Sequence, residues 1–157
     1  MSVQFNDYSM QVKAAIEEKA LIFLDEAASE LKSQTQRNTP VDTSNLKGSW
    51  DYIVNKGKKE ATIGSPLENA VWTELGTGEY ALEGKGKKGA WYVPVEKATG
   101  RKKPSFNGKV VIVHGKNGKS FYKTNGKKPV RMLFNAFTTK KAAIINRAKQ
   151  IFGELGT

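Results

Sequence analysis

Residues 9–37 read SMQVKAAIEEKALIFLDEAASELKSQTQR, and this segment sets the architecture of the chain. Apolar side chains recur in it at steps of three and four residues, a spacing that places them on one face of an α-helix. The members of this stripe are Val12, Ile16, Ala20, Phe23, Ala27 and Leu31. Pro40 limits the helix because the residue before a proline is displaced from the helical region. We therefore expect a long helix over 9–37 with one buried stripe and four glutamates facing water: Glu17, Glu18, Glu26 and Glu30.

Two alternating segments after this helix indicate a β-hairpin. Residues 49–55 place Trp50, Tyr52 and Val54 on one face, and residues 60–64 alternate in the same way. The four residues between them, which include one glycine, suit the turn of a hairpin.

A short helix is expected next. The run Ser65-Pro66-Leu67-Glu68 has the form of a capping box, with serine as the cap and proline at the first helical position. Gly76 and Gly78 follow at a distance of about two turns, and glycine is the residue that most often ends a helix.

The second half of the chain contains further strand signals and one more helix. Residues 91–95 form one strand candidate, and residues 109–114 pair with 119–124 around Asn117-Gly118, a strong signal for a two-residue hairpin turn. That turn would set Lys116 opposite Lys119. A second long helix is expected from Pro129 to Leu155, with a buried face formed by Leu133, Phe137, Ile144, Ala148, Ile151 and Leu155.

The order of these elements predicts an α+β fold. An antiparallel sheet would pack with the two long helices at the ends of the chain, joined by one short helix and a basic β-hairpin extension. At 157 residues the chain has the size of one domain. We therefore expect a single domain over 1–157, with a Gly- and Lys-rich β-region at about 84–128 inserted between the short helix and the last one.

Positive charge is concentrated in that inserted region. The chain carries 26 Lys and Arg against 15 Asp and Glu, a formal net charge of +11. Fourteen of these basic residues lie between Lys85 and Arg131, where Glu96 is the one acid, so the rest of the chain is nearly neutral. A field of one sign favours an anionic partner, either nucleic acid or an acidic protein face. A set of solvated lysine-rich loops would show the same pattern.

The residues do not support an enzyme. The chain has no Cys and one His, His114, which has no acid near it in sequence to orient it as a base. Residues 84–89, GKGKKG, match the letters of a dinucleotide-binding loop but precede a strand rather than a helix. Residues 115–120, GKNGKS, lack the first glycine of a phosphate-binding loop. We expect no catalytic, cofactor-binding or metal-binding residues and no small-molecule substrate.

A small basic nucleic-acid-binding protein is the alternative function. Lysines that contact phosphates, interleaved with aromatic side chains that stack on bases, are typical of single-strand binding. The aromatic residues of the basic region are Trp91, Tyr92, Phe106, Phe121 and Tyr122, which equally suit the inward faces of strands. Arg101 and Arg131 are the two arginines there, so contacts with DNA would be directed to the backbone and carry little sequence preference.

Four motifs, in order along the chain, resemble those of a phage protein family. They are residues 39–50, TPVDTSNLKGSW; residues 61–65, ATIGS; residues 70–78, AVWTELGTG; and residues 128–137, KPVRMLFNAF. Together they are similar to the minor tail components of long-tailed double-stranded DNA phages, which act at the neck as head–tail connector or tail-completion proteins. The resemblance covers most of the chain, and the basic β-region carries over least.

The resemblance implies a non-enzymatic structural protein of the virion, assembled in the bacterial cytoplasm. Its expected partners are further copies of itself in a ring, adjoining neck or tail proteins and, transiently, packaged DNA, with no membrane: the run Ala20–Leu24 is too short to span one. Ring closure requires two different patches on each subunit. Candidate subunit-interface residues are Trp72, Glu74, Gly76, Thr77 and Gly78. Candidate contacts with an anionic partner are Lys116, Lys119, Lys127, Lys128 and Arg131.

Glu74 is the most informative of these residues. It is expected in the last turn of the short helix, where a carboxylate interacts unfavourably with the helix dipole. Such a position suggests a cationic partner, for instance a Lys or Arg of a neighbouring subunit. A glutamate exposed to solvent without a partner is equally consistent with the sequence.

Overall fold

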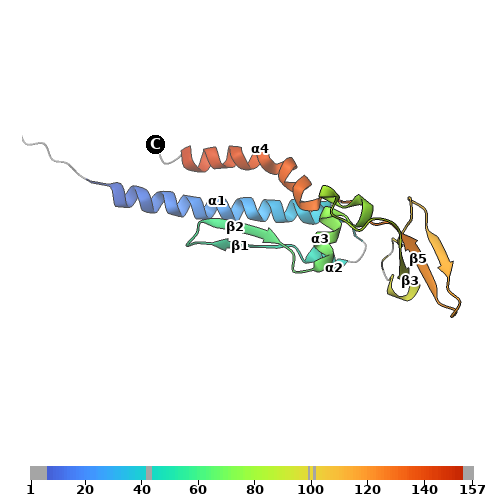
Figure 1. The fold of residues 1–157 in the computed structure, drawn as a ribbon. Helices are drawn as coiled ribbons and strands as arrows, with labels where there is room; N and C mark the ends of the chain where they lie inside the picture. The colour runs from blue at the N-terminus through green and yellow to red at the C-terminus, as the bar shows by residue number, and fades with distance from the viewer. Residues whose placement is uncertain (1–6, 42–43, 99, 101, 154–157) are drawn as a thin grey trace, which may run out of the picture.

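The computed structural model describes residues 7–41, 44–98, 100 and 102–153, and its fold is α+β, with an antiparallel sheet packed against helices. Helix α1 (Ser9–Asn38) and helix α4 (Met132–Gly153) run side by side in opposite directions. Figure 1 shows an elongated molecule in which α1 is the long central helix, with α4 on one side of it and the first β-hairpin on the other. The predicted fold class is confirmed.

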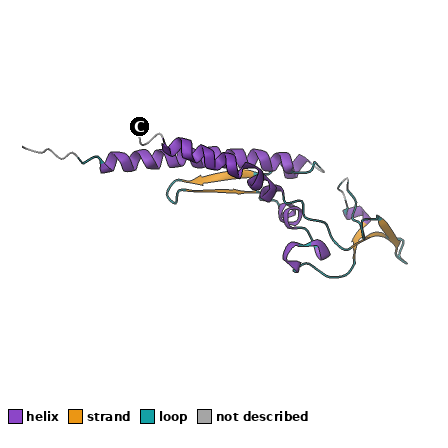
Figure 2. Cartoon of the chain, turned by 90° about the horizontal axis from the view of Figure 1, so that it is seen from above, coloured by secondary structure: helices purple, strands orange, loops and turns teal. Residues whose placement is uncertain are grey.

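The hairpin of β1 (Asp51–Asn55) and β2 (Glu60–Gly64) lies along α1 (Figures 1 and 2). The two strands pair antiparallel with Asp51 opposite Gly64. Tyr52 and Val54 are partly covered, whereas Asp51, Ile53 and Asn55 are exposed, as the alternation predicted. Ile53, on the outer face, is 76% exposed.

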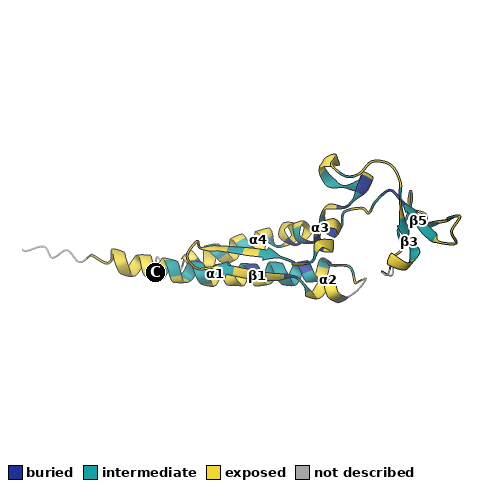
Figure 3. Ribbon diagram, turned by 60° about the horizontal axis from the view of Figure 1, so that its bottom comes forward, coloured by how far each residue is buried: buried dark blue, intermediate teal, exposed yellow. Residues whose placement is uncertain are grey.

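The core is small and lies where the remaining helices meet α4. Helix α2 (Ser44–Gly48), which the sequence did not predict, and helix α3 (Glu68–Leu75) contribute one buried residue each to a cluster around Met132. The buried members are Leu46, Trp50, Ala70 and Met132. Figure 3 shows how few residues are buried elsewhere, so this cluster is the main apolar anchor of the described chain.

Two helix starts differ from the prediction. Helix α3 begins at Glu68 without a side-chain cap, because the Ser65 hydroxyl accepts the Leu67 N–H, 3.2 Å away, in a local turn instead of capping a helix. Helix α4 begins at Met132 rather than Pro129, because Arg131 adopts a left-handed backbone with φ +56°. The predicted end of that helix, residues 154–157, lies outside the described residues.

The basic region forms a second sheet rather than a lone hairpin. Strands β3 (Trp91–Pro94), β5 (Ser120–Thr124) and β4 (Val111–His114) lie in the order β3-β5-β4, all antiparallel. Figures 1 and 2 place this sheet at the end of the molecule, beyond α3 and away from the paired long helices. We call these strands with their connecting loops, residues 91–124, the basic sheet.

The tip of the β4–β5 hairpin differs from the predicted two-residue turn. The last strand pair is His114 with Ser120, and the Gly115 N–H donates to the Lys119 carbonyl at 2.8 Å. This hydrogen bond leaves a loop of three residues, 116–118. Gly118 is the one loop residue with a positive φ, +75°, as is typical of a three-residue hairpin loop. The predicted pairing of Lys116 opposite Lys119 is therefore wrong.

The buried stripe of α1 is confirmed only along its middle. Val12 and Ile16 are 54% and 44% exposed, because α4 does not cover the first turns of α1 (Figure 1). On α4 the predicted core residue Phe137 is 49% exposed, whereas its neighbour Ala136 is fully buried. At this turn of α4 the covered residue is therefore Ala136 instead of Phe137, whereas Leu133, Ile144, Ala148 and Ile151 are partly or fully buried as predicted.

Three of the four glutamates expected in water form surface ion pairs that tie α1 to other elements. Glu17 lies 3.1 Å from the Lys59 ammonium, Glu30 lies 2.6 Å from that of Lys140, and Glu26 accepts two hydrogen bonds from Arg147. The hydrogen bonds from Arg147 and Lys140 hold the pKa of Glu26 and of Glu30 below its usual range. Exposed pairs of this kind add little stability each; Glu26–Arg147 and Glu30–Lys140 join α1 to α4, and Glu17–Lys59 joins α1 to the β1–β2 turn.

Candidate docking surfaces

The basic sheet is joined to the helical body by two chain segments that run against each other, residues 76–86 and 124–131, which we call the junction. Backbone hydrogen bonds connect them: the Thr77 N–H donates to the Lys127 carbonyl and the Glu79 N–H to the Asn125 carbonyl, each at 2.9 Å. The Thr77 hydroxyl in turn accepts the Lys127 N–H at 3.0 Å. The junction therefore holds the sheet to the body through hydrogen bonds rather than through a large apolar interface.

Gly76 and Gly78 are buried in the junction. Both have positive φ, +77° and +62°. A Cβ on Gly76 would lie 2.9 Å from the Lys127 carbonyl oxygen, and one on Gly78 would overlap the Asn125 carbonyl and the Trp91 ring. The predicted interface residues Gly76, Thr77 and Gly78 are thus occupied with contacts inside the chain, and a role between subunits stays a prediction.

Asn125 is the centre of the junction and was not identified from the sequence. Its side chain is 2% exposed. The amide nitrogen donates to the Glu79 carboxylate at 2.7 Å, to Asn107 at 3.0 Å and to the Tyr80 hydroxyl at 3.3 Å. No periodicity or motif marks such a residue, because its partners lie 18 to 46 positions away.

Glu74 has a partner within the chain. Its two carboxylate oxygens accept the backbone N–H groups of Leu133 and Phe134, each at 3.0 Å. These N–H groups belong to the first turn of α4, where they have no partner inside the helix and where the dipole favours a negative charge. The carboxylate that is poorly placed for its own helix is therefore well placed for the next one.

We expect Glu74→Ala to lower the free energy of unfolding by about 1–2 kcal/mol, since that is the usual effect of removing a helix cap. Urea denaturation followed by circular dichroism measures it. Glu68→Ala, an exposed glutamate of the same helix, is the matched control and should change stability by a few tenths of a kcal/mol. Equal effects of the two variants would show that the cap contributes nothing.

The structure divides the five predicted cationic residues into two groups. Lys127 donates to the Thr73 hydroxyl at 3.1 Å, Lys128 lies over the Tyr80 ring, and Arg131 stacks on the Phe134 ring at 3.5 Å. These three belong to the junction and the start of α4. Lys116 and Lys119 lie instead at the exposed tip of the basic sheet, where the structure gives their ammonium groups no ion pair.

The aromatic side chains of the basic sheet are mostly used within it. Tyr122 is 7% exposed, and the ammonium groups of Lys87 and Lys123 lie over the Trp91 and Phe106 rings. Tyr92, 55% exposed, is the one aromatic of the described sheet with a largely open ring. The described sheet therefore offers one broad stacking face rather than a row of them.

An apolar groove of about 510 Å³ lies where β2, α3 and α4 meet. Its apolar walls include Ile63, Leu75, Leu82, Phe134 and Phe137, and two charged residues, Glu74 and Arg131, also line it. Leu75, Phe134 and Phe137 are each close to half exposed, and Trp72 on α3 is 49% exposed. We call this the α4 groove. Exposed apolar side chains gathered in this way are typical of a surface that contacts another protein.

The described residues carry no arrangement typical of catalysis or metal binding. His114 forms a 2.9 Å hydrogen bond with the Ser120 hydroxyl at the end of the sheet, with no acid beside it. Over the described part of the chain, no three His, Cys, Asp or Glu side chains gather as they would around a metal ion. Nor does any helix described there combine the length and apolar character needed to cross a membrane.

The described residues thus form a helical body with exposed apolar side chains and, at one end, a lysine-rich sheet. Residues 4–76, a little under half of the chain, match a family model described as "Bacteriophage HK97-gp10, putative tail-component". The resemblance to a phage tail-component family is thereby confirmed. The first two motifs lie within the matched residues, and the third extends two residues beyond them.

Neither the curated proteins nor the solved structures contain a significant match to this chain. The class of protein that residues 4–76 resemble is therefore the one named by the family model, a putative phage tail component.

Proposed function

We propose that this protein forms a homo-oligomeric ring at the junction of phage head and tail, as a connector or tail-completion component assembled in the bacterial cytoplasm, with no enzymatic activity. The chain acts as one domain, and its partners are further copies of itself and the adjoining neck or tail proteins. The observation that carries the proposal is the presence of two exposed surfaces of different character. Exposed apolar side chains gather on the helical body around the α4 groove, and the basic sheet at one end has a surplus of lysines beside exposed apolar residues of its own, Tyr92, Val110, Ile112 and Val113.

The apolar surfaces suit contacts between identical subunits. Such contacts remain buried in the assembled particle and gain most of their free energy from removing apolar area from water. Trp72 and Leu75 on α3, together with Phe134 and Phe137 on α4, are candidates for this role.

The basic sheet suits a neighbour with an acidic face. A lumen through which DNA slides should not hold it tightly, so we assign the sheet to docking on an adjoining protein ring, where complementary charge fixes partner and orientation. Passing contact with packaged DNA is compatible with this placement. Lys116 and Lys119 are the residues to test, because Lys127 and Lys128 have structural contacts that a substitution would disturb.

Lys116→Glu/Lys119→Glu should leave the fold and the subunit ring intact and lower the yield of infectious particles at least about tenfold, since each 1.4 kcal/mol of lost contact free energy is a factor of ten. The measurement is particle yield when the variant replaces the wild-type protein during infection. Lys56→Glu/Lys58→Glu makes the same charge change at the β1–β2 turn and serves as the control. Normal yield from the tip variant would contradict the docking role.

Light scattering of the purified protein, with and without a short DNA duplex at low and moderate salt, tests the ring itself. A discrete oligomeric mass that DNA does not change is the expected result. A monomer that binds the duplex and dissociates from it as salt rises would overturn the proposal in favour of a nucleic-acid-binding protein.

A further inference from the structure

The first turns of α1 project beyond the rest of the molecule. Figure 1 shows α1 extending past both the β1–β2 hairpin and the end of α4. The hairpin reaches α1 at the Glu17–Lys59 ion pair, and the Phe152 ring of α4 packs edge-on against Phe23. Residues 8–18, which precede or border these contacts, form what we call the α1 arm.

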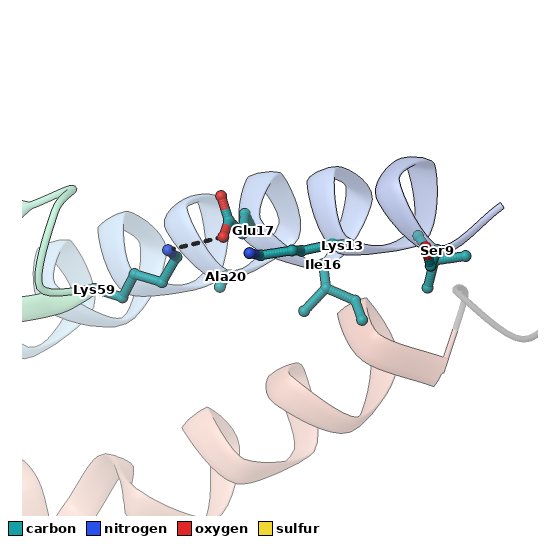
Figure 4. Close-up of a pocket in the computed structure, with 7 residues that line it drawn as sticks. Ser9, Lys13, Ile16, Glu17, Ala20 and Lys59 are labelled. Atoms are coloured by element: carbon teal, nitrogen blue, oxygen red, sulfur yellow. Dashed lines mark ion pairs between the residues drawn. The ribbon is translucent and has the colours of Figure 1, made fainter. Parts of the chain in front are cut away.

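The α1 arm is apolar on one side and uncovered there. Tyr8, Val12 and Ile16 follow one another at four-residue steps and are 59%, 54% and 44% exposed. The shallow trough beside them is lined by α1 residues and Lys59, and by no residue of α4 (Figure 4). Three exposed apolar side chains gathered on one face in this way are typical of a surface that contacts another protein.

The α4 groove is an apolar surface of matching kind, lined also by the Arg131 guanidinium and by the Glu74 carboxylate, whose oxygens are already bonded to the first N–H groups of α4. Arg131 stacks on the Phe134 ring, which fixes its guanidinium in place. No carboxylate or carbonyl of the described residues accepts a hydrogen bond from that guanidinium. A guanidinium held in this way is prepared for a carboxylate of the molecule that fills the groove.

The α1 arm carries such a carboxylate. Glu18 is exposed and has no ion pair among the described residues, unlike Glu17, whose partner is Lys59. The arm therefore offers apolar side chains at helical spacing and, on the flank of the helix about 120° from the centre of that stripe, one unpaired acid. An amphipathic helix laid in an apolar groove is a common mode of protein recognition.

The arm cannot reach the groove of its own chain. Leu31, the α1 residue that lines the groove, lies thirteen positions after Glu18 on the same continuous helix. At about 1.5 Å per residue this corresponds to about 20 Å along a rigid rod. The occupant must come from another molecule.

We infer that the α1 arm of one copy docks in the α4 groove of the next copy, with Glu18 paired to Arg131 across the contact. Arm and groove are different patches, so the contact is of the head-to-tail type that generates a ring when the rotation closes. Each subunit of a closed ring then makes the contact twice, which compensates for the small area of a single arm. The inference rests on the proposed self-assembly and specifies which surfaces carry it.

Cysteine cross-linking tests the contact, because the natural chain contains no cysteine. Val12→Cys protein is mixed with Phe137→Cys protein of different tag length and oxidised. The expected product is a mixed dimer with a yield at least about tenfold above that from Val12→Cys with Ile53→Cys, an exposed control position on β1. Equal yields from the two mixtures, or no product from the first, would overturn the inference.

Charge reversal provides a second, independent test of the contact. Glu18→Arg, on an exposed helix surface, should lower the cross-linking yield at least about tenfold, and the combination with Arg131→Glu should restore it. A double variant no better than the single one would contradict the Glu18–Arg131 pairing.

The mass of the unmodified protein separates this inference from the proposed ring. A discrete ring that gives no Val12–Phe137 product would overturn the arm-in-groove contact and leave ring formation supported. A monomeric mass with selective cross-linking would support the contact and count against a stable ring.

Discussion

Gly78→Ala is expected to destabilise the junction by about 3 kcal/mol or more. Two effects combine. Alanine at φ +62° costs about 1–2 kcal/mol relative to glycine. Its Cβ would also overlap the Asn125 carbonyl and the Trp91 ring, both of which are held by neighbouring structure, and overpacking of a tight site costs about 1–3 kcal/mol.

The effect should be local at first, because the atoms that an added Cβ at Gly78 would meet belong to Asn125 of the junction and Trp91 of the basic sheet. We expect residues 85–131 to become sensitive to limited trypsin digestion, which their lysines make easy to follow, while helix content stays near wild type. Urea denaturation should then give two midpoints: residues 85–131 should become sensitive to trypsin at a lower urea concentration than the one at which circular dichroism reports loss of the helices.

Gly89→Ala is the matched control for this prediction. Gly89 has a comparable φ, +77°, but no atom lies within 4 Å of the place that a Cβ would take there. It should therefore show the backbone cost of about 1–2 kcal/mol without the steric one. Equal losses from the two variants would mean that close approach at Gly78 contributes nothing and that the junction is looser than its hydrogen bonds indicate.

Local patterns in the sequence predicted most elements and few of their contacts. The period of residues 9–37 and the alternation in 51–55 and 60–64 reflect interactions between near neighbours, and α1, β1 and β2 follow them. The predicted start of α3 was wrong because a serine three residues before a helix can close a turn as well as cap a helix, and Ser65 closes a turn.

The candidate sites depended on contacts that no local pattern encodes. Glu74 was recognised as unusual from the dipole of its own helix, but its partner is the start of a helix 59 positions away. Spacing alone could not decide which residue of this turn of α4 is buried, because Ala136 and Phe137 are adjacent and both apolar. Tertiary placement buries the smaller residue and leaves the larger one for the α4 groove.

The proposed single domain has a physical consequence that links the junction to the core. The basic sheet has little apolar contact with the helical body, so their cooperation in unfolding depends on the hydrogen bonds around Asn125. If the chain unfolds as one unit, a substitution in the core must release the sheet at the same urea concentration as the helices.

Met132→Ala supplies that substitution. Met132 is fully buried at the start of α4 and contacts residues from α2, α3 and the approach to β1, so its removal leaves a cavity where four segments meet. Truncation of a buried methionine costs about 2–5 kcal/mol. We expect a single urea transition at lower midpoint, with trypsin sensitivity of residues 85–131 and loss of helix content coinciding.

Met10→Ala is the control for Met132→Ala, because Met10 is 79% exposed and its loss should change the free energy of unfolding by less than about 0.5 kcal/mol. It also leaves the core untouched while altering the α1 arm. Two separate transitions in Met132→Ala, with helix content lost before the sheet becomes sensitive to trypsin, would contradict the single domain. The basic sheet would then be an independently stable module, and its orientation in the ring would be set by its partner rather than by the junction.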